Sequence, residues 1–366
     1  TRQFTDLLVE PDVPYAYQLA PYEVILGEVL YSSISDILEI VLDDYFVDDA
    51  GLVELMYSAA DWGDYDNDGD LDLAITGYNL SSPSGTVARI YRNDAGTFVD
   101  ILADLVPVEA GKVRWIDLGD DDTLDLVITG STHFHYPNVV NSTYVYANID
   151  NAGSPISQTL LSNATITQGD MTTDDFNNDG REDILLVTPE ETRMYYHDSG
   201  TQFIATDIGF HAYSRAGCAS ADYDVDGDKD IVLAGRQEGL NWIVTRRFKN
   251  EGGSFVSDPH AIPSLSYPSF TFVDQDNNGT MELLAAGTVS SGWYADLFAA
   301  GGTSWIGDPT LTPLGSAMAA WGDADNDGDP DLVMRGVFAS YPDPPPYGRT
   351  FLYYTRGLGA TVASDF

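Results

Sequence analysis

The sequence predicts an all-β fold, a seven-bladed β-propeller of four-stranded antiparallel blades that occupies residues 1–366 as a single domain. First, a segment rich in Asp and Gly and followed by an apolar strand recurs six times, with about 50 residues between copies. Second, the intervals hold short apolar runs separated by Gly, Asn and Asp, as in an antiparallel sheet. Third, hydrophobic residues make up 43% of the chain and aromatic residues 12%, which is enough to bury a large core.

The clearest repeat predicts four strands, Ala59–Gly63, Leu71–Thr76, Ala88–Arg92 and Thr97–Ile101. An acidic loop, Asp64–Asp72, joins the first strand to the second. Four strands of this length with tight turns make one blade of about 50 residues. The blades that carry an acidic loop are expected to start near residues 58, 112, 169, 217, 269 and 317.

A further blade, without an acidic loop, is expected over about residues 13–57. Its strands would be Glu23–Gly27, Asp36–Leu42 and Leu52–Met56. Within residues 1–9, Gln3–Leu8 has the pattern of a fourth strand and would close the ring by completing the last blade. Gly359–Asp365 has the same pattern, so the sequence leaves open which chain end closes the ring. An open β-roll is the alternative architecture, and its much shorter repeats disfavour it.

The charge is strongly negative, with 58 Asp and Glu residues against 16 Lys and Arg residues and a formal net charge of −42. Nucleic acid is excluded as a partner, because binding a polyanion needs a basic stripe and the longest basic cluster is Arg246-Arg247. The acidity must therefore be solvated, compensated by salt or bound to metal. Cys218 is the only cysteine, so rigidity must come from packing or metals and not from a disulfide within the chain.

The sequence contains no apolar run that approaches the roughly 18 residues of a membrane span. We therefore expect no membrane-spanning segment. The chain opens directly on mature-looking sequence, and we expect a secreted monomer, extracellular or at the cell surface, whose signal peptide has been removed.

The acidic loops alternate carboxylates in the pattern D-x-D-x-D-G-x-x-D, as at Asp64, Asp66, Asp68 and Asp72. Calcium takes six to eight oxygen ligands at about 2.3 to 2.6 Å, and alternating carboxylates on a tightly curled loop converge on one point. The glycine permits the turn, and the main-chain carbonyl of Asp70 would complete the shell. The alternative is a set of Asx-turns that hold polar loops without a metal. Several good copies in register favour calcium, with about five or six ions bound per chain.

Six loops supply the predicted calcium ligands, and three of them keep every carboxylate. Two others, which begin at Asp175 and Asp274, replace some carboxylates by amide or longer carboxylate groups. The Asp117 loop is the weakest, because Gly119 stands where a carboxylate is expected. The predicted ligands are Asp64, Asp66, Asp68, Asp70 and Asp72; Asp117, Asp121 and Asp125; Asp175, Asn177, Asp179, Arg181 and Asp183; Asp222, Asp224, Asp226, Asp228 and Asp230; Asp274, Asp276, Asn278, Thr280 and Glu282; and Asp323, Asp325, Asp327, Asp329 and Asp331.

The run Trp62-Gly63-Asp64-Tyr65-Asp66-Asn67-Asp68-Gly69-Asp70-Leu71-Asp72-Leu73 resembles the FG-GAP/VCBS repeats of integrin α-subunit propellers and of many secreted bacterial proteins. The resemblance covers nearly the whole chain. It implies a propeller with calcium in the loop between the first and second strands, used in adhesion, in carbohydrate binding or as a module beside an enzyme. The sequence departs from the pattern at Asp117 and in the N-terminal blade.

The loops that join second to third strands differ in every blade, whereas the acidic loops are near copies of one another. In an up-and-down blade these two sets of loops lie on opposite faces. Aromatic residues concentrate in the variable set, where rigid rings expose stacking area at a low entropy cost. The predicted ligand face contains Tyr136, Trp242, Trp293, Tyr294 and Tyr347. The alternative is that these aromatics only cover the blade ends.

We therefore expect a secreted, calcium-stabilised recognition module of adhesion type that binds an extracellular glycan or protein. The alternative is a polysaccharide-active enzyme, a lyase or hydrolase, on a propeller scaffold. The sequence shows no nucleophile motif, and we assign no catalytic residue. Trp62, Trp115 and Trp321 stand at one position before the loops and are predicted to be core residues, and Cys218 is predicted to be a small buried hydrophobe.

Overall fold

The computed structural model describes residues 22–25, 28–31, 52–53, 55–79, 85–118, 123–132, 141–149, 155–162, 169–240, 242–299, 311–322, 330–337, 348–356 and 360–365. The chain divides into two compact units, Thr1–Gly51 and Leu52–Phe366. The described part of the first unit is an antiparallel hairpin of β1 (Tyr22–Ile25) and β2 (Glu28–Tyr31). Among the described residues, no helix is long and apolar enough to span a membrane.

The second unit is built from antiparallel sheets whose strands follow one another in chain order. The first sheet contains β3 (Met56–Gly63), β4 (Asp72–Tyr78), β5 (Thr86–Asp94) and β6 (Thr97–Asp100). The second contains β7 (Glu109–Ile116), β8 (Asp125–Ser131), β9 (Asn141–Ile149) and β10 (Pro155–Ser162). The third contains β11 (Asp170–Asp174), β12 (Asp183–Val187), β13 (Thr192–Ser199) and β14 (Gln202–Thr206).

The remaining sheets continue this order. The fourth contains β15 (Tyr213–Ala221), β16 (Asp230–Gln237), β17 (Trp242–Asn250) and β18 (Phe255–Asp258). The fifth contains β19 (Ser266–Val273), β20 (Glu282–Val289) and β21 (Gly292–Phe298). The last contains β22 (Gly315–Gly322), β23 (Asp331–Val337), β24 (Gly348–Arg356) and β25 (Ala360–Asp365).

The prediction of a β-propeller with four-stranded antiparallel blades is confirmed, but the predicted number of blades is wrong. The described residues form five four-stranded blades, not seven, together with the three-stranded fifth sheet. The seventh blade was inferred from residues 13–57, the copy that diverges most from the repeat, and most of that segment lies outside the described residues. So does Gln3–Leu8, whereas the other candidate for ring closure forms β25 and pairs with β24 as the fourth strand of the last sheet.

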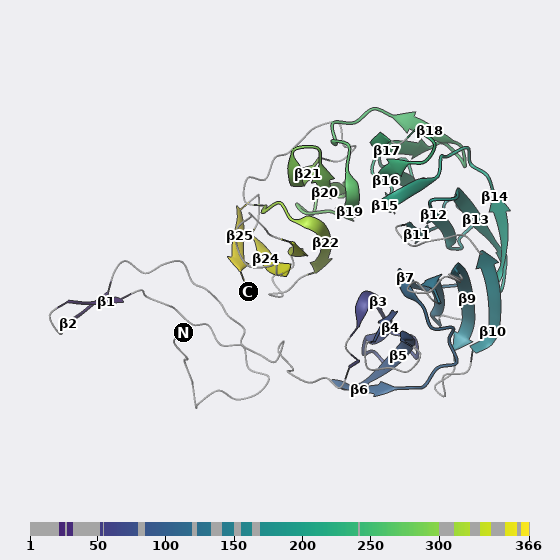
Figure 1. The fold of residues 1–366 in the computed structure, drawn as a ribbon, viewed down its shortest axis with the longest axis horizontal. Coiled ribbons are helices and arrows are strands. Elements are labelled where there is room, and N and C mark those ends of the chain that lie inside the picture. Colours follow the sequence, from purple (N-terminus) through teal and green to yellow (C-terminus); the bar gives the residue numbers. More distant parts are fainter. Residues whose placement is uncertain are drawn as a thin grey trace. The chain divides into compact units, whose positions relative to one another are not determined.

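The core lies between successive sheets. First strands of neighbouring sheets contact one another, and in Figure 1 they lie on the inner side of the unit while fourth strands lie outside. Second strands that lie between two described sheets are therefore covered on both faces, and β8 is buried at every position. Apolar runs such as Ile231–Ala234 are fully buried for this reason, since they pack between two sheets and need not alternate with polar residues.

Five of the first strands contain a β-bulge, seen as a shift of register within β3, β7, β15, β19 and β22. Four bulge residues have left-handed backbone with φ of 49°, 54°, 52° and 51°, namely Tyr57, Ala110, Arg215 and Tyr267. A glycine of the second strand lies under each bulge. A Cβ atom on Gly235, for example, would lie 2.9 Å from the carbonyl oxygen of Ser214. Thr188 takes this place in the third sheet, where β11 and β12 pair without a register shift.

Candidate metal centres and recognition face

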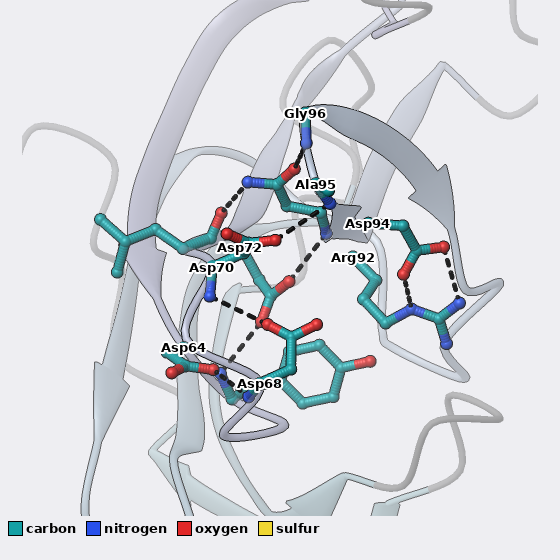
Figure 2. A network of polar contacts seen from close by, with 11 residues as sticks. Asp64, Asp68, Asp70, Asp72, Arg92, Asp94, Ala95 and Gly96 are labelled. Carbon is teal, nitrogen blue, oxygen red and sulfur yellow. Dashed lines mark hydrogen bonds and ion pairs between the residues drawn. The ribbon is translucent and has the colours of Figure 1, made fainter. Parts of the chain in front are cut away.

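The acidic loop of the first sheet curls around the carboxylate of its first residue. The backbone N–H groups of Asp68 and Gly69 donate to the two carboxylate oxygens of Asp64, each at 3.0 Å (Figure 2). The loops that begin at Asp175, Asp222 and Asp274 repeat these two hydrogen bonds at 2.8 to 3.1 Å. Four of the six predicted loops thus share one conformation.

The closing carboxylate of the loop ties three segments together. Asp72 is fully buried and accepts hydrogen bonds from the N–H of Tyr65 at 3.0 Å and from the N–H of Asn93, on the third strand, at 2.8 Å. Asp183 and Asp230 accept the same pair of bonds in their own sheets. Glu282 accepts from the N–H of Gln275 at 3.0 Å. The last position of the motif therefore joins the loop to the blade.

Two loop positions have left-handed backbone. The glycine at the sixth position has a φ of 86° to 97° in the four loops, a range that favours glycine. The fourth position has a φ of 58° in Asn67, 57° in Asn178 and 54° in Asn277, and asparagine tolerates this conformation. Val225, with a φ of 63°, occupies the fourth position of the Asp222 loop although its β-branched side chain disfavours it.

Carboxylates converge on one point in three loops. Asp64, Asp66 and Asp72 each offer an oxygen within 4.8 Å of the others, and the same holds for Asp222, Asp224 and Asp230 and for Asp274, Asp276 and Glu282. The environment of two of these oxygens indicates whether a cation fits the site. Oδ1 of Asp66 and Oδ1 of Asp224, at the third position of their loops, are buried without a hydrogen-bond partner. A buried anionic oxygen without a donor is unfavourable, and a hard cation at the centre of each group would satisfy it.

The surroundings of these carboxylates oppose their ionisation. Burial raises the pKa of Asp183 and of Asp230 to about 7, although hydrogen bonds from backbone N–H groups act in the opposite direction. Burial also raises the pKa of Asp72 and Glu282. A bound divalent cation reverses this balance, because it favours the ionised form of its ligands.

The seventh residue of the motif turns its side chain away from the converging carboxylates. The carboxylate of Asp70 accepts the N–H of Ala95 at 3.0 Å, and that of Asp228 accepts the N–H of Gly252 at 2.7 Å. At this position the main-chain carbonyl, and not the carboxylate, stays the predicted ligand. Sequence reasoning missed the role of the turn between third and fourth strands, although Asn93 and Asn250, each three residues before a glycine, mark it.

The other predicted ligands differ in detail. Asn177 donates from its side-chain amide to the carboxylate of Asp179 at 3.1 Å, so these two residues partly satisfy each other. In four loops the backbone N–H of the seventh residue donates to the side chain of the fifth residue. The distance is 3.0 Å for Arg181, 2.8 Å for Thr280 and 2.9 Å for both Asp70 and Asp228.

Two loops are described only in part. In the Asp117 loop, the carboxylate of Asp125 accepts the N–H of Leu118 at 3.1 Å, while Asp121 lies outside the described residues. In the last loop Asp331 is buried, and residues 323–329, with the predicted ligands Asp323, Asp325, Asp327 and Asp329, lie outside them as well.

Comparison with known proteins agrees with this geometry. Residues 175–233, which span the third and fourth acidic loops, match the family model of the FG-GAP-like repeat. The chain is a β-propeller, and residues 175–233 form an FG-GAP-like repeat within it. No curated protein sequence matches it.

Comparison with solved structures found similar chains at low sequence identity. A lectin of Agrocybe aegerita that recognises non-reducing terminal N-acetylglucosamine is 15% identical, with a TM-score of 0.53 over 86% of this chain and 81% of the lectin. An endo-1,4-β-xylanase of Bacteroides thetaiotaomicron is 11% identical, with a TM-score of 0.36 over 71% of this chain and 94% of that one. A β-fructofuranosidase of Schwanniomyces occidentalis is 9% identical, with a TM-score of 0.35 over 82% and 75%.

The acidic loops also pack against the next blade. The ring of Tyr65, in the first loop, stacks on the indole of Trp115 at 5.6 Å between centroids, and Tyr223 stacks on Phe272 at 6.3 Å. Trp115 is buried, as predicted. The prediction of a core position is wrong for Trp62, which is 52% exposed. Burial at this repeat position requires a ring from the preceding loop, such as the one that Tyr65 provides for Trp115.

The predicted ligand face of the propeller is described in part. Trp242 begins β17 and exposes 65% of its surface. Trp293 and Tyr294, on β21, are half-buried, and burial and the nearby carboxylate of Asp296 raise the pKa of Tyr294. Tyr136 and Tyr347 lie outside the described residues.

Proposed function

We propose that this FG-GAP propeller is a secreted, calcium-stabilised recognition module that binds an extracellular glycan. The observation that carries the recognition role is the exposure of Trp242, 65% of whose surface is accessible at the end of the fourth sheet away from its acidic loop. Exposed indoles stack on sugar rings and apolar side chains, and they dominate many binding surfaces. The fold shared with a lectin favours a glycan over a protein ligand.

Calcium has a structural role in this proposal. About five or six ions would bind in the acidic loops through carboxylate, amide and main-chain oxygens. The carboxylates would be held in their ionised form, and the buried oxygens of Asp66 and Asp224 would gain a ligand. In the Asp222 loop the ammonium group of Lys249, 2.5 Å from the carboxylate of Asp224, would share that carboxylate with the ion.

Position on the blade separates the two roles. Asp230, in the acidic loop, and Gln237, the partner of Trp242, are seven positions apart along extended β16, which corresponds to roughly 23 Å. A ligand stacked on Trp242 therefore would not touch the ions. Calcium would act on recognition only through the rigidity of the blade.

A glycan array probed with the calcium-loaded chain tests the proposal, followed by titration of the best hit. Trp242→Ala should weaken binding by about tenfold or more and leave the melting temperature unchanged. Trp62→Ala is the matched control, because Trp62 is 52% exposed but stands beside an acidic loop. Loss of binding in Trp62→Ala but not in Trp242→Ala, or an array without any hit, would contradict the proposal.

A further inference from the structure

Arg215 and Tyr267 lie side by side on the first strands of neighbouring sheets. The guanidinium carbon of Arg215, on β15, is 5.1 Å from the centroid of the Tyr267 ring, on β19. Arg215 is half-buried and Tyr267 is 41% exposed. Both residues stand near the start of their strands, at the ends away from the acidic loops. The pair is therefore open to solvent on the side of the propeller that carries Trp242.

The backbone of this pair is strained. Arg215 has a φ of 52° and Tyr267 a φ of 51°, a region that large side chains rarely adopt. Tyr267 also precedes Pro268, and a residue before proline favours extended backbone. Glycine or asparagine would fit either bulge with less strain. The same left-handed backbone recurs at the bulges of Tyr57 and Ala110, so it belongs to the bulge, and what sets this pair apart is a cationic and an aromatic side chain at neighbouring bulges.

The two strands hold the pair in place. A Cβ atom on Gly217 would lie 2.6 Å from the carbonyl oxygen of Pro268, so the backbones of β15 and β19 approach as closely as a glycine permits. Gly217 follows Arg215 by two residues, and Pro268 follows Tyr267 directly. Because the backbones that carry the pair are held together before any ligand arrives, binding does not need to order them.

Arg215 carries a positive charge beside the Tyr267 ring. Among the described residues it forms no ion pair, although the chain carries a formal net charge of −42. Lys112, at the bulge of β7, lies 3.0 Å from a carboxylate oxygen of Asp170, and Arg247 pairs with Asp258. A guanidinium group binds a carboxylate through two parallel N–H donors, so Arg215 is suited to a carboxylate that the protein does not supply.

We propose that Arg215 and Tyr267 form a subsite for a single carboxylate on an acidic saccharide, such as a terminal uronic acid. This inference rests on the proposed function. Trp242 pairs with Gln237, and Gln237 pairs with Tyr213, which precedes Arg215 by two residues. The exposed indole therefore lies at the same end of the sheet as Arg215, where it can stack on the sugar ring. A polyanionic glycan is disfavoured, because the net negative charge of the chain repels it.

Titration of the calcium-loaded full chain with methyl β-glucuronide and methyl β-glucoside, followed by NMR, tests the inference. The glucuronide should bind about tenfold more tightly or better, equivalent to about 1.4 kcal/mol. Arg215→Gln should abolish this preference. Arg193→Gln is the control, because it removes one positive charge from a guanidinium group that is already paired with Glu191 at 2.9 Å.

Equal affinity for the two sugars, or a preference that survives Arg215→Gln, would overturn the inference and leave the glycan-binding function standing. Acetate binding as tightly as the glucuronide would show that the sugar contributes nothing and would overturn the saccharide assignment. Binding of neither sugar would overturn the inference, whereas the proposed function is tested separately by the glycan array and by the Trp242→Ala and Trp62→Ala variants. Arg215→Asn tolerates left-handed backbone and provides a second variant in case Arg215→Gln does not fold.

Discussion

The indole of Trp115 lies parallel to the ring of Tyr65, with 3° between the two planes and 5.6 Å between the centroids. The stack joins an acidic loop of one sheet to the first strand of the next. The indole N–H of Trp115 also donates to the carbonyl oxygen of Asp61 at 3.2 Å, and its backbone N–H donates to the carboxylate of Asp61 at 2.8 Å. One tryptophan thus provides packing and hydrogen bonds at a blade interface.

Trp115→Leu should lower the free energy of unfolding by about 2 to 4 kcal/mol, because it removes a buried stack and a hydrogen bond. Trp62→Leu makes the same chemical change at an exposed position and should change it by less than about 1 kcal/mol. Urea unfolding followed by circular dichroism measures both. Equal losses would mean that Trp62 is covered in solution.

Removal of calcium should reverse the effect of Asp230→Asn. With calcium the substitution should lower the melting temperature, since it removes a charged ligand. In EDTA it should raise the melting temperature or leave it unchanged, because the buried carboxylate then has no cation beside it. Differential scanning calorimetry under both conditions checks this. A variant that is equally destabilised with and without calcium would show that Asp230 acts only through its hydrogen bonds to Tyr223 and Asn250.

The pH dependence of stability should also change with calcium. Burial raises the pKa of Asp183 and Asp230 from 3.8 to about 7 in the metal-free fold. A raised pKa means that the protonated form favours folding, so this stability is fully present below the unfolded pKa and is lost as the pH rises through about 7. In EDTA the melting temperature should therefore fall between about pH 4 and about pH 7.

Saturating calcium should remove that fall, because the ion holds the carboxylates ionised. The double variant Asp183→Asn with Asp230→Asn separates the local effect from repulsion across the whole acidic chain. If it shows the same pH profile in EDTA as the unchanged chain, these two carboxylates are not its source.

Val225→Asn should stabilise the chain by about 0.5 to 1 kcal/mol, because asparagine tolerates the left-handed backbone that Val225 adopts with a φ of 63°. Val225 is 59% exposed, so little packing is lost. Asn67→Val is the reciprocal change and should destabilise the first loop by a similar amount. Thermal unfolding at saturating calcium measures both, and a loss of stability in Val225→Asn would refute this account.

Much of the fold follows from local rules. The spacing of Asp64, Asp68 and Asp72 predicts the loop, because the hydrogen bonds that curl it join residues close together in the sequence. The bonds from the loop to the turn between third and fourth strands are not local and were not predicted. The burial of a side chain between two blades is harder to predict, because it depends on residues of the neighbouring sheet. Trp62 and Trp115 occupy the same repeat position, yet only Trp115 is buried, because the ring of Tyr65 reaches it from the preceding loop.

The number of blades depends on the copy that departs most from the pattern, and repeat counting gave seven where the described residues form five four-stranded blades. The bulges could have been recognised from Gly77, Gly130, Gly235 and Gly287, which recur five residues after the closing position of each loop. Thr188 stands at that place in the one described sheet whose first strand pairs without a register shift. That signal links two strands, and a search for loop motifs alone does not detect it.

The carboxylate of Asp228 accepts a hydrogen bond from the N–H of Gly252, in the turn that leads to β18. The outermost strand of the fourth sheet, Phe255–Asp258, thus begins at a turn fastened to the acidic loop although it contributes no predicted ligand. Loosening the loop would free the start of this strand, whose neighbour in the described sheet is β17 alone. Loss of the ion would then cause local unfolding of β18 first. This strand would become accessible to proteases while the inner strands of the sheet stayed packed.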